Sequence, residues 1–258
     1  MLRDEKNNIG GKILIDIKGR WALVTGASRG IGYELVHFLA DRGCNLIIHS
    51  RKLESTKSLE KELLKKDIQV LRVAAEFTDM KQVDQMLETI DSFDVTVGLV
   101  FNNAGYQIAY RTDYFSTPME DYEISFKINT MAPAKICYHF IPKMIENGFG
   151  RVINTTSDIA LEPEQAGYSA SKAALDKITI DLSSKLDGTN VLLNLTNPGW
   201  SRTELGGPSA PYDVKDSLPG VALGAFIDDE INGNLFDAPN YHGLSLEEAL
   251  EKVKETRA

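Results

Sequence analysis

Short runs of consecutive apolar residues recur along the chain, each bounded by glycine, polar or charged positions. The runs are rich in branched residues and do not alternate strictly between apolar and polar, which is typical of strands buried on both faces. Such strands belong to parallel sheets that helices cover on either side. The pattern therefore predicts buried parallel strands at residues 22–24, 46–48, 70–73, 98–101, 152–153 and 191–193.

Longer amphipathic stretches separate these runs and predict helices. In the first stretch, Ile31, Leu35, Phe38 and Leu39 share one helical face, and Gly43 follows as a stop signal. Further helices are predicted at about residues 53–66, 80–90, 118–147 and 166–186, with a short one in the tail at 245–257. Alternation of strand and helix indicates right-handed βαβ units and a doubly wound parallel β-sheet of the α/β class.

One segment interrupts this alternation. Residues 199–220 are dense in glycine and proline and predict a long loop, and such loops in compact domains are usually functional lids or disordered.

The chain has 258 residues, of which 43% are hydrophobic and 25% charged, a balance typical of a globular protein. We therefore expect a single domain over residues 1–258, with a Gly/Pro-rich substrate loop at about 199–220.

Charge and cysteine content exclude several classes of function. A net charge of −9 disfavours binding to nucleic acid or to an anionic membrane surface. No apolar run approaches the ~20 residues of a membrane helix, and residues 1–6 lack the apolar core of a secretory signal, so we expect a cytoplasmic location. Cys44 and Cys137 are far apart and belong to no Cys/His cluster, which predicts two buried thiols, no disulfide and no metal site.

The turn after the first predicted strand is rich in glycine. Residues 25–32 read Thr-Gly-Ala-Ser-Arg-Gly-Ile-Gly, so that Gly26, Gly30 and Gly32 open a helix with the spacing G-x-x-x-G-x-G. Because side chains are missing there, a phosphate can approach the backbone, whose free N–H groups and helix dipole favour its charge. The pattern indicates a pyrophosphate site, and the alternative is a tight strand-to-helix turn that binds nothing.

The end of the second strand indicates which dinucleotide would bind. Folds that select NAD usually place an acid there for the ribose 2′-hydroxyl, whereas this strand ends in Ser50, Arg51 and Lys52. Arg29 lies in the glycine turn itself, and an arginine fork suits a 2′-phosphate. NADP(H) is therefore predicted in preference to NAD(H). The alternative is that Arg51 and Lys52 merely begin a solvated helix.

Tyr168 and Lys172 are spaced to share one face of a predicted helix. Of the nine tyrosines, only Tyr168 has a lysine four residues later. About one such basic partner arises by chance in a chain of this composition, so the pair alone is weak evidence. An ammonium beside a phenol favours the phenolate, so we expect Lys172 to lower the pKa of Tyr168 from ~10 toward the working range of an acid–base catalyst.

Two polar residues are candidates to complete this site. Ser157 ends a predicted strand, and ligands of doubly wound sheets bind at the carboxyl ends of strands, although an isolated serine more often only helps to turn the chain. Asn129 precedes Pro133 by four residues. The N–H that Pro133 lacks frees the Asn129 carbonyl for a water, which could relay protons from Lys172. The alternative for Asn129 is a proline kink without function.

Taken in order, these motifs resemble those of the short-chain dehydrogenase/reductase family, which has a single-domain, Rossmann-like fold. The resemblance covers the chain from about residue 20 to 205. One motif alone would be weak evidence, whereas the ordered set is strong. The matching pieces are residues 25–32, Asn102-Asn103-Ala104-Gly105, Asn129, Ser157, Tyr168-x-x-x-Lys172, and Asn197-Pro198-Gly199 with Thr203.

The resemblance implies a role for each matching residue. Tyr168 would be the general acid–base, Lys172 would lower its pKa and bind the nicotinamide ribose, Ser157 would position the substrate carbonyl, and Asn129 would support a water relay. The implied cofactor-binding residues are Gly26, Ala27, Ser28, Arg29, Gly30, Ile31 and Gly32 in the turn, Ser50 and Arg51 after the second strand, Glu76 and Phe77 at the adenine, Asn103, Ala104 and Gly105 along the adenosine, and Tyr168, Lys172, Pro198, Gly199 and Thr203 near the nicotinamide. Arg29 and Arg51 match the positions that select NADP.

The sequence departs from the family pattern at two places. The position that contacts adenine is usually Asp followed by a small apolar residue, whereas here it is Glu76-Phe77. The usual C-terminal strand ending in Asp-Gly-Gly is replaced by Ile-Asn-Gly-Asn-Leu-Phe at residues 231–236. The resemblance further implies a homodimer or homotetramer, with the fourth and fifth helices as the dimer face.

These observations predict an NADPH-dependent oxidoreductase that reduces a ketone or aldehyde to an alcohol, reversibly, with a proton from Tyr168. The partner would be a small-molecule carbonyl or alcohol. One alternative is a non-catalytic NADP-binding protein that acts as a redox sensor or scaffold, in which Tyr168, Lys172 and Ser157 would be unused. Another keeps the fold but reduces an imine or an enoyl group.

Overall fold

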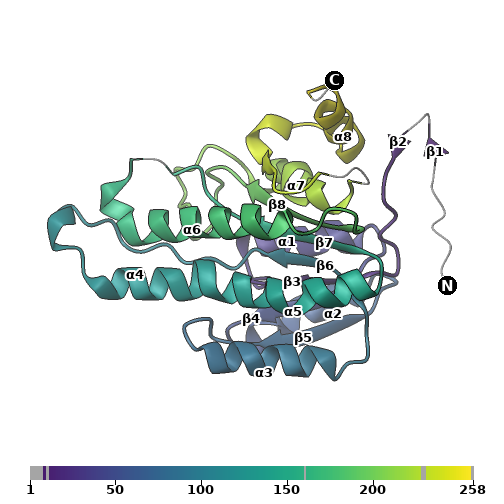
Figure 1. The fold of residues 1–258 in the computed structure, drawn as a ribbon, viewed down its shortest axis with the longest axis horizontal. Coiled ribbons are helices and arrows are strands. Elements are labelled where there is room, and N and C mark those ends of the chain that lie inside the picture. Colours follow the sequence, from purple (N-terminus) through teal and green to yellow (C-terminus); the bar gives the residue numbers. More distant parts are fainter. Residues whose placement is uncertain (1–7, 10–11, 160, 228–230, 257–258) are drawn as a thin grey trace.

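The computed structural model describes residues 8–9, 12–159, 161–227 and 231–256. Its centre is a seven-stranded sheet in the order β5-β4-β3-β6-β7-β8-β9, in which every neighbouring pair is parallel (Figure 1). The predicted doubly wound α/β class is confirmed. The strands are β3 (Trp21–Val24), β4 (Asn45–Ser50), β5 (Val70–Ala74), β6 (Val97–Asn102), β7 (Gly150–Thr155), β8 (Val191–Asn197) and β9 (Leu235–Asp237), preceded by an antiparallel pair, β1 (Asn8–Ile9) and β2 (Lys12–Ile13).

Helices cover both faces of this sheet (Figure 1). The α-helices are α1 (Gly30–Ala40), α2 (Lys57–Leu63), α3 (Met80–Asp91), α4 (Met119–Phe126), α5 (Ala132–Glu146), α6 (Ala166–Ser183), α7 (Val214–Ala222) and α8 (Leu246–Glu255). Short 3-10 helices lie at η1 (Leu53–Thr56), η2 (Tyr114–Ser116), η4 (Pro163–Gln165), η5 (Leu223–Ala225) and η6 (Ala238–Tyr241).

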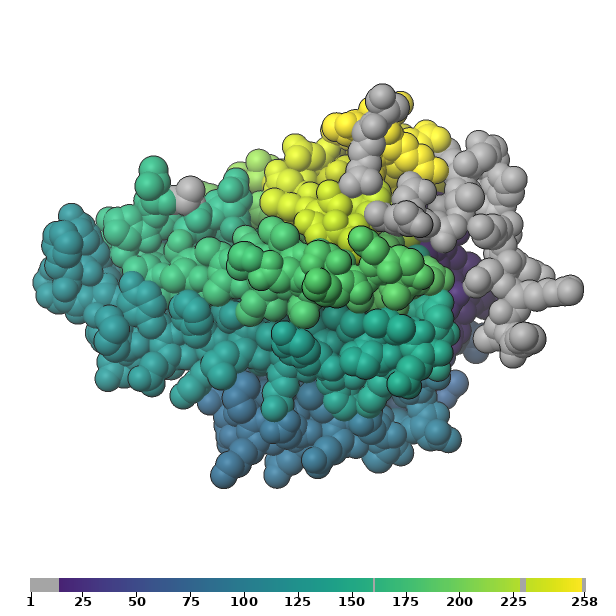
Figure 2. All heavy atoms as spheres, in the orientation of Figure 1, coloured from purple at the N-terminus to yellow at the C-terminus, as the bar shows by residue number. Residues whose placement is uncertain are grey.

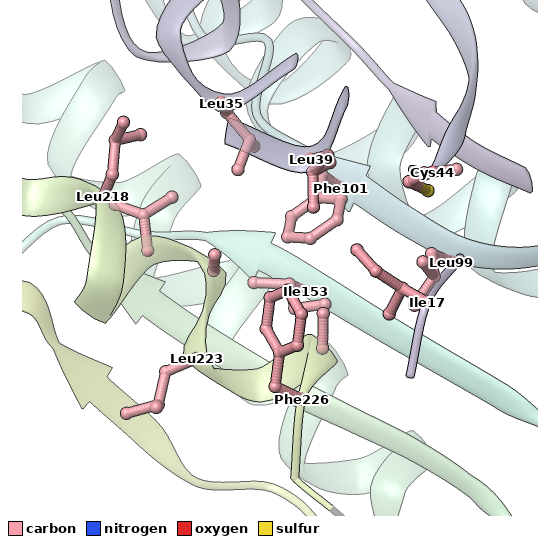
Figure 3. Close-up of a cluster of buried hydrophobic side chains, with 14 of the residues drawn as sticks. Ile17, Leu35, Leu39, Cys44, Leu99, Phe101, Ile153, Leu218, Leu223 and Phe226 are labelled. Atoms are coloured by element: carbon pink, nitrogen blue, oxygen red, sulfur yellow. The ribbon is translucent and has the colours of Figure 1, made fainter. Parts of the chain in front are cut away.

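Consecutive strand residues point to opposite faces and enter two separate cores. On β3, Val24 packs with α1, α7 and α8, whereas Leu23 packs with α3 and α5. Figure 3 shows part of the first core, in which Leu35 and Leu39 of α1 lie on one side and Phe226 lies on the other. The prediction of strands buried on both faces is therefore confirmed for β3, β4, β6, β7 and β8, whereas the edge strand β5 is only partly buried. Cys44 and Cys137 are buried free thiols, as predicted.

The helix expected at 118–147 is divided in the structure. It consists of α4, a π-helical turn η3 (Lys127–Met131), and α5, which has Pro133 in its first turn. Pro133 has no N–H to donate to the carbonyl of residue 129, so the regular α-helical hydrogen bond is missing at this point. The backbone forms a π-helical turn instead, in which hydrogen bonds join residues five positions apart. The predicted local disturbance is thus present, and it places Asn129 inside the π-helical turn.

The loop predicted over 199–220 is wrong in its last part. After Asp213 the chain forms α7, and the side chain of Asp213 accepts a hydrogen bond from the backbone N–H of Lys215 at 3.0 Å. Val214, Leu218 and Val221 form a buried apolar face at helical spacing. The density of proline and glycine hides this periodicity in the sequence.

The atypical C-terminal segment still completes the sheet. Strand β9 pairs in parallel with β8, in a register that places Leu235 opposite Leu195. The tail then forms α8 within the predicted range, with a capping box in which Ser245 and Glu248 satisfy each other's backbone N–H groups. The family's usual end of the chain is therefore replaced by a different sequence that forms a strand in the same sheet.

Candidate active site

The glycine turn lies between the end of β3 and the start of α1. Gly26 and Gly30 adopt left-handed backbone conformations with φ of +68° and +56°. A Cβ atom added to Gly26 would lie 2.9 Å from the Cα of Ala104, and one added to Gly32 would lie 2.3 Å from the Gly26 carbonyl oxygen. The packing therefore requires glycine at these positions, as the predicted phosphate turn implies.

The N-terminus of α1 is suited to an anion. Its N-cap, Arg29, makes no side-chain cap, and the first turn holds no acidic residue. The first N–H groups of a helix have no partner within the helix, and the helix dipole adds positive potential there. Ser28, Arg29, Gly30 and Ile31 surround this helix start. The residues present thus fit the pyrophosphate of a dinucleotide.

The segment after β6 is tied directly to this turn. The backbone N–H groups of Asn103 and Ala104 donate to Thr25 Oγ1 at 3.0 and 2.9 Å, and Asn103 Nδ2 donates to the Thr25 carbonyl at 2.9 Å. Thr25 belongs to the motif but was not among the predicted site residues. Its hydroxyl holds the Asn103–Gly105 segment beside the glycine turn.

The four predicted catalytic residues come from three elements that meet at one place. Tyr168 and Lys172 share a face of α6, with Lys172 Nζ 5.8 Å from the centroid of the phenol ring. Ser157 follows β7, and its side chain hydrogen-bonds that of Tyr168. A Cβ atom placed on Gly105 would lie 3.6 Å from both Lys172 Nζ and Asn129 Oδ1. The structure therefore brings the four residues to one place, beside Gly105 of the segment that follows β6.

Hydrogen bonds fix the orientation of Asn129. Its Nδ2 donates to the Tyr106 carbonyl at 2.8 Å and to Ser171 Oγ at 3.0 Å, while its Oδ1 accepts from the Tyr106 N–H at 2.9 Å. Tyr106 is not among the predicted site residues, and its backbone orients the Asn129 side chain. Lys172 Nζ donates to the Thr155 carbonyl at 2.8 Å, which holds the ammonium at the end of β7.

Burial is the largest influence on the pKa values of Tyr168 and Lys172. It raises the pKa of Tyr168, and the hydrogen bond with Ser157 acts in the opposite direction. The sequence predicts a pKa lowered by Lys172, so the net direction differs. The reason is that Tyr168 is buried and Lys172 directs its ammonium to Thr155. Burial also lowers the pKa of Lys172 to about 8, against a smaller opposing effect of the carboxylate of Asp176.

The predicted NADP-selecting residues lie around the turn. Ser50 is the last residue of β4, and its hydroxyl donates to the Lys52 carbonyl at 2.7 Å, while Arg51 is exposed. The guanidinium of Arg29 forms an exposed ion pair with Glu204. Sequence reasoning missed Glu204, because nothing local in the sequence links it to a residue 175 positions earlier.

The predicted nicotinamide-end residues follow β8. Gly199 has a φ of +70°, and its N–H donates to Asn197 Oδ1 at 3.1 Å, directly after Pro198. A Cβ atom added to Gly30 would lie 3.2 Å from Thr203 Cγ2, so the segment that follows β8 reaches the glycine turn. At the other end, Glu76 and Phe77 follow β5, with Phe77 buried. The predicted residues that follow β5 and β8 therefore lie at the carboxyl ends of their strands, and those after β8 reach the glycine turn.

Two further features of the molecule concern metal binding and membrane spans. Among the described residues, no group of three or more His, Cys, Asp and Glu side chains is arranged to hold a metal ion. Within the same part of the chain, no helix combines the length and apolar character that crossing a bilayer requires.

Comparisons with known proteins agree with this geometry. A family model described as short chain dehydrogenase matches residues 20–212. The chain is 31% identical over 192 residues to the uncharacterised oxidoreductase YvaG of Bacillus subtilis, covering 74% of this chain and 71% of that one. It is 28% identical over 204 residues to an NADPH-dependent aldehyde reductase-like chloroplastic protein of Arabidopsis thaliana, covering 74% and 76%. A blue fluorescent protein from a metagenomic library, solved with NADPH, superposes with a TM-score of 0.77 at 27% identity, covering 86% and 97%.

Proposed function

The chain belongs to the short-chain dehydrogenase family and is an oxidoreductase, and on that premise we propose that it reduces a ketone or aldehyde to an alcohol, reversibly, with NADPH. One observation carries the proposal. Tyr168, Ser157, Lys172 and Asn129 converge beside Gly105, at the edge of the sheet that also holds the glycine turn. The first three are the proton donor, the substrate anchor and the cation that carbonyl reduction needs.

Each side chain of the site would have a separate part in the reduction. Bound NADPH would supply the hydride. The raised pKa keeps the Tyr168 phenol protonated at neutral pH, so that it can donate its proton to the carbonyl oxygen. Ser157, which hydrogen-bonds the same phenol, orients that oxygen. Lys172 Nζ, which like Asn129 Oδ1 lies beside Gly105, would be the next proton-bearing group after the phenol.

Replacing Tyr168 tests this proposal. Tyr168→Phe keeps the ring and removes the proton donor, so carbonyl reduction should fall by about 10²- to 10⁴-fold. Activity is followed as loss of NADPH absorbance with a panel of ketones, aldehydes, imines and enoyl compounds. Tyr33→Phe, on α1, removes a phenol hydroxyl that donates to Glu62 at 2.6 Å and is the matched control, which should remain near the wild-type rate. Wild-type activity of Tyr168→Phe would refute the proposed role.

We further propose that NADP(H) is preferred over NAD(H). β4 ends without an acid at Ser50, and Arg51 and Lys52 follow it, exposed to solvent. A carboxylate at position 51 would repel a 2′-phosphate, so Arg51→Glu should weaken NADPH binding while leaving NADH binding almost unchanged. Lys61→Glu makes the same charge change at an exposed site on α2 and serves as the control. Equal effects of Arg51→Glu on both cofactors would refute this account.

We also propose that the chain forms a homodimer, or a homotetramer built from it, across α5 and α6. These helices lie side by side on one face of the molecule (Figure 2). Large apolar side chains are exposed on these helices, namely Tyr138, Ile145 and Ile180, and Met131 is exposed in the adjoining turn η3. Light scattering coupled to size-exclusion chromatography should give at least twice the monomer mass. Ile180→Glu should reduce this mass, and a monomeric wild-type protein would refute the proposal.

A further inference from the structure

A buried histidine lies beneath the glycine turn. His49 is on β4, 1% exposed, and both ring nitrogens have partners. Its Nδ1 lies 3.2 Å from the backbone nitrogen of Gly26, and its Nε2 lies 3.1 Å from the carbonyl oxygen of Ala75. The N–H of Gly26 can only donate and the carbonyl of Ala75 can only accept. His49 is therefore the neutral tautomer with its proton on Nε2.

The backbone of His49 holds the same turn. Its carbonyl accepts the N–H of Ala27 at 2.9 Å. Two consecutive N–H groups, those of Gly26 and Ala27, are therefore directed to one residue of the neighbouring strand. Helix α1 begins at Gly30, four positions after Gly26, so its N-terminal N–H groups lie beyond those that His49 binds. His49 thus fixes the entry to the turn and leaves the helix start available for an anion.

The imidazole also contacts the other end of the cofactor site. The ring of Phe77 is stacked on His49 with centroids 4.4 Å apart and planes inclined by 11°. Phe77 is 3% exposed, and it stands where the family usually has a small apolar residue. The phenyl ring at position 77, which the usual small residue would lack, packs against the imidazole. The hydrogen bond to the Ala75 carbonyl connects the same histidine to the end of β5.

We propose that His49 is a positioning residue that holds the phosphate turn and the adenine edge of the cofactor site in fixed relation, so that it sets affinity for NADP(H). It touches the backbone of the turn and the side chain of Phe77, and it takes no part in proton transfer. The inference rests on the proposed cofactor. Its basis is one side chain that joins β3, β4 and β5 where their carboxyl ends meet the proposed ligand.

Two substitutions separate the hydrogen bonds from the packing. His49→Phe keeps a ring against Phe77 but leaves the Gly26 N–H without its acceptor, and it should weaken NADPH binding by about tenfold, the effect of one ordinary hydrogen bond. His49→Asn loses the ring but can place its Oδ1 where Nδ1 stood, and it should bind NADPH within about threefold of the wild type. Binding is measured by calorimetric titration with NADPH, without substrate.

Rates and stability provide the remaining readouts. At saturating NADPH both variants should keep kcat within about twofold, because the turn affects binding and not the proton donor. Val253→Ala, a core truncation on α8, should lower the melting temperature without changing the affinity for NADPH. This control shows that loss of stability alone does not weaken binding.

Each outcome decides the question. Tenfold weaker binding by His49→Phe with recovery in His49→Asn supports the proposal. Wild-type affinity of His49→Phe, or equal losses in both variants, overturns it while leaving the proposed function intact. Failure of the wild-type chain to bind NADPH in the same titration would overturn both the proposed cofactor and this inference.

Discussion

Removing the buried ammonium of Lys172 should make stability less dependent on pH in the alkaline range. The side chain is 4% exposed, and burial lowers its pKa from 10.5 to about 8. This lowering corresponds to roughly 3 kcal/mol of unfavourable free energy in the folded protein at neutral pH. Lys172→Met keeps most of the apolar stem and removes that cost. It also leaves the Thr155 carbonyl without its donor, a loss of about 1–3 kcal/mol that does not vary with pH.

The sign of the effect follows from the two protonation equilibria. Below pH 8 the amine is protonated in both the folded and the unfolded chain, and the full cost is present. Between pH 8 and 10.5 the folded chain releases its proton first, so the cost diminishes as pH rises. From pH 7 to 9.5 the unfolding free energy of the wild type should therefore rise by about 2 kcal/mol relative to that of Lys172→Met.

Urea unfolding of both proteins at pH 7.0, 8.0, 9.0 and 9.5 measures this difference. Lys177→Met lies on the same helix, but Lys177 is exposed and paired with Asp181, so this control should show no such trend. Carbonyl reduction should fall by at least about 100-fold in Lys172→Met and stay unchanged in the control. A stability difference between wild type and Lys172→Met that is flat from pH 7 to 9.5 would refute the reasoning.

Three further expectations concern neighbouring residues. Burial lowers the pKa of His49 from 6.5 to about 4, so the wild type should lose roughly 3 kcal/mol of stability as pH falls through that window, and His49→Phe should lack this loss in urea unfolding. Glu204→Gln should release Arg29 and strengthen NADPH binding by up to about fivefold in a calorimetric titration, since exposed ion pairs contribute little. Ser157→Ala removes the hydrogen bond that lowers the pKa of Tyr168, so kcat should fall by about 10- to 100-fold and the pH–rate profile should shift upward.

The sheet and the common location of the candidate catalytic residues could be predicted from local patterns and the order of the motifs. Runs such as 46–48 are apolar at every position because neighbouring residues enter different cores, as Ile47 and Ile48 do. The spacing of Tyr168 and Lys172 on one helix fixes their common face without reference to the rest of the chain. The rule that ligands bind at the carboxyl ends of strands makes Ser157 only a candidate, and the ordered set of motifs is what singles it out.

The features that were missed depend on contacts between distant segments. Helix α7 contains Pro219, a residue that argues against a helix unless packing of Leu218 and Val221 compensates. The pKa of Tyr168 depends on how deeply the phenol is buried, which the spacing to Lys172 does not express. The role of His49 could not be predicted from the sequence of its own strand, because its hydrogen-bond partners lie just after β3 and β5.

The glycine turn is held from both sides, and this bears on how the cofactor would bind. Thr25 connects the turn to the segment after β6 through three hydrogen bonds, and His49 connects it to β4 and β5. Glycine is the most flexible residue, so a turn made of glycines would otherwise lose much conformational entropy when it closes on a phosphate. Because the flanking strands already fix this turn, most of that entropy is lost on folding, and binding energy from the phosphate contacts is retained as affinity.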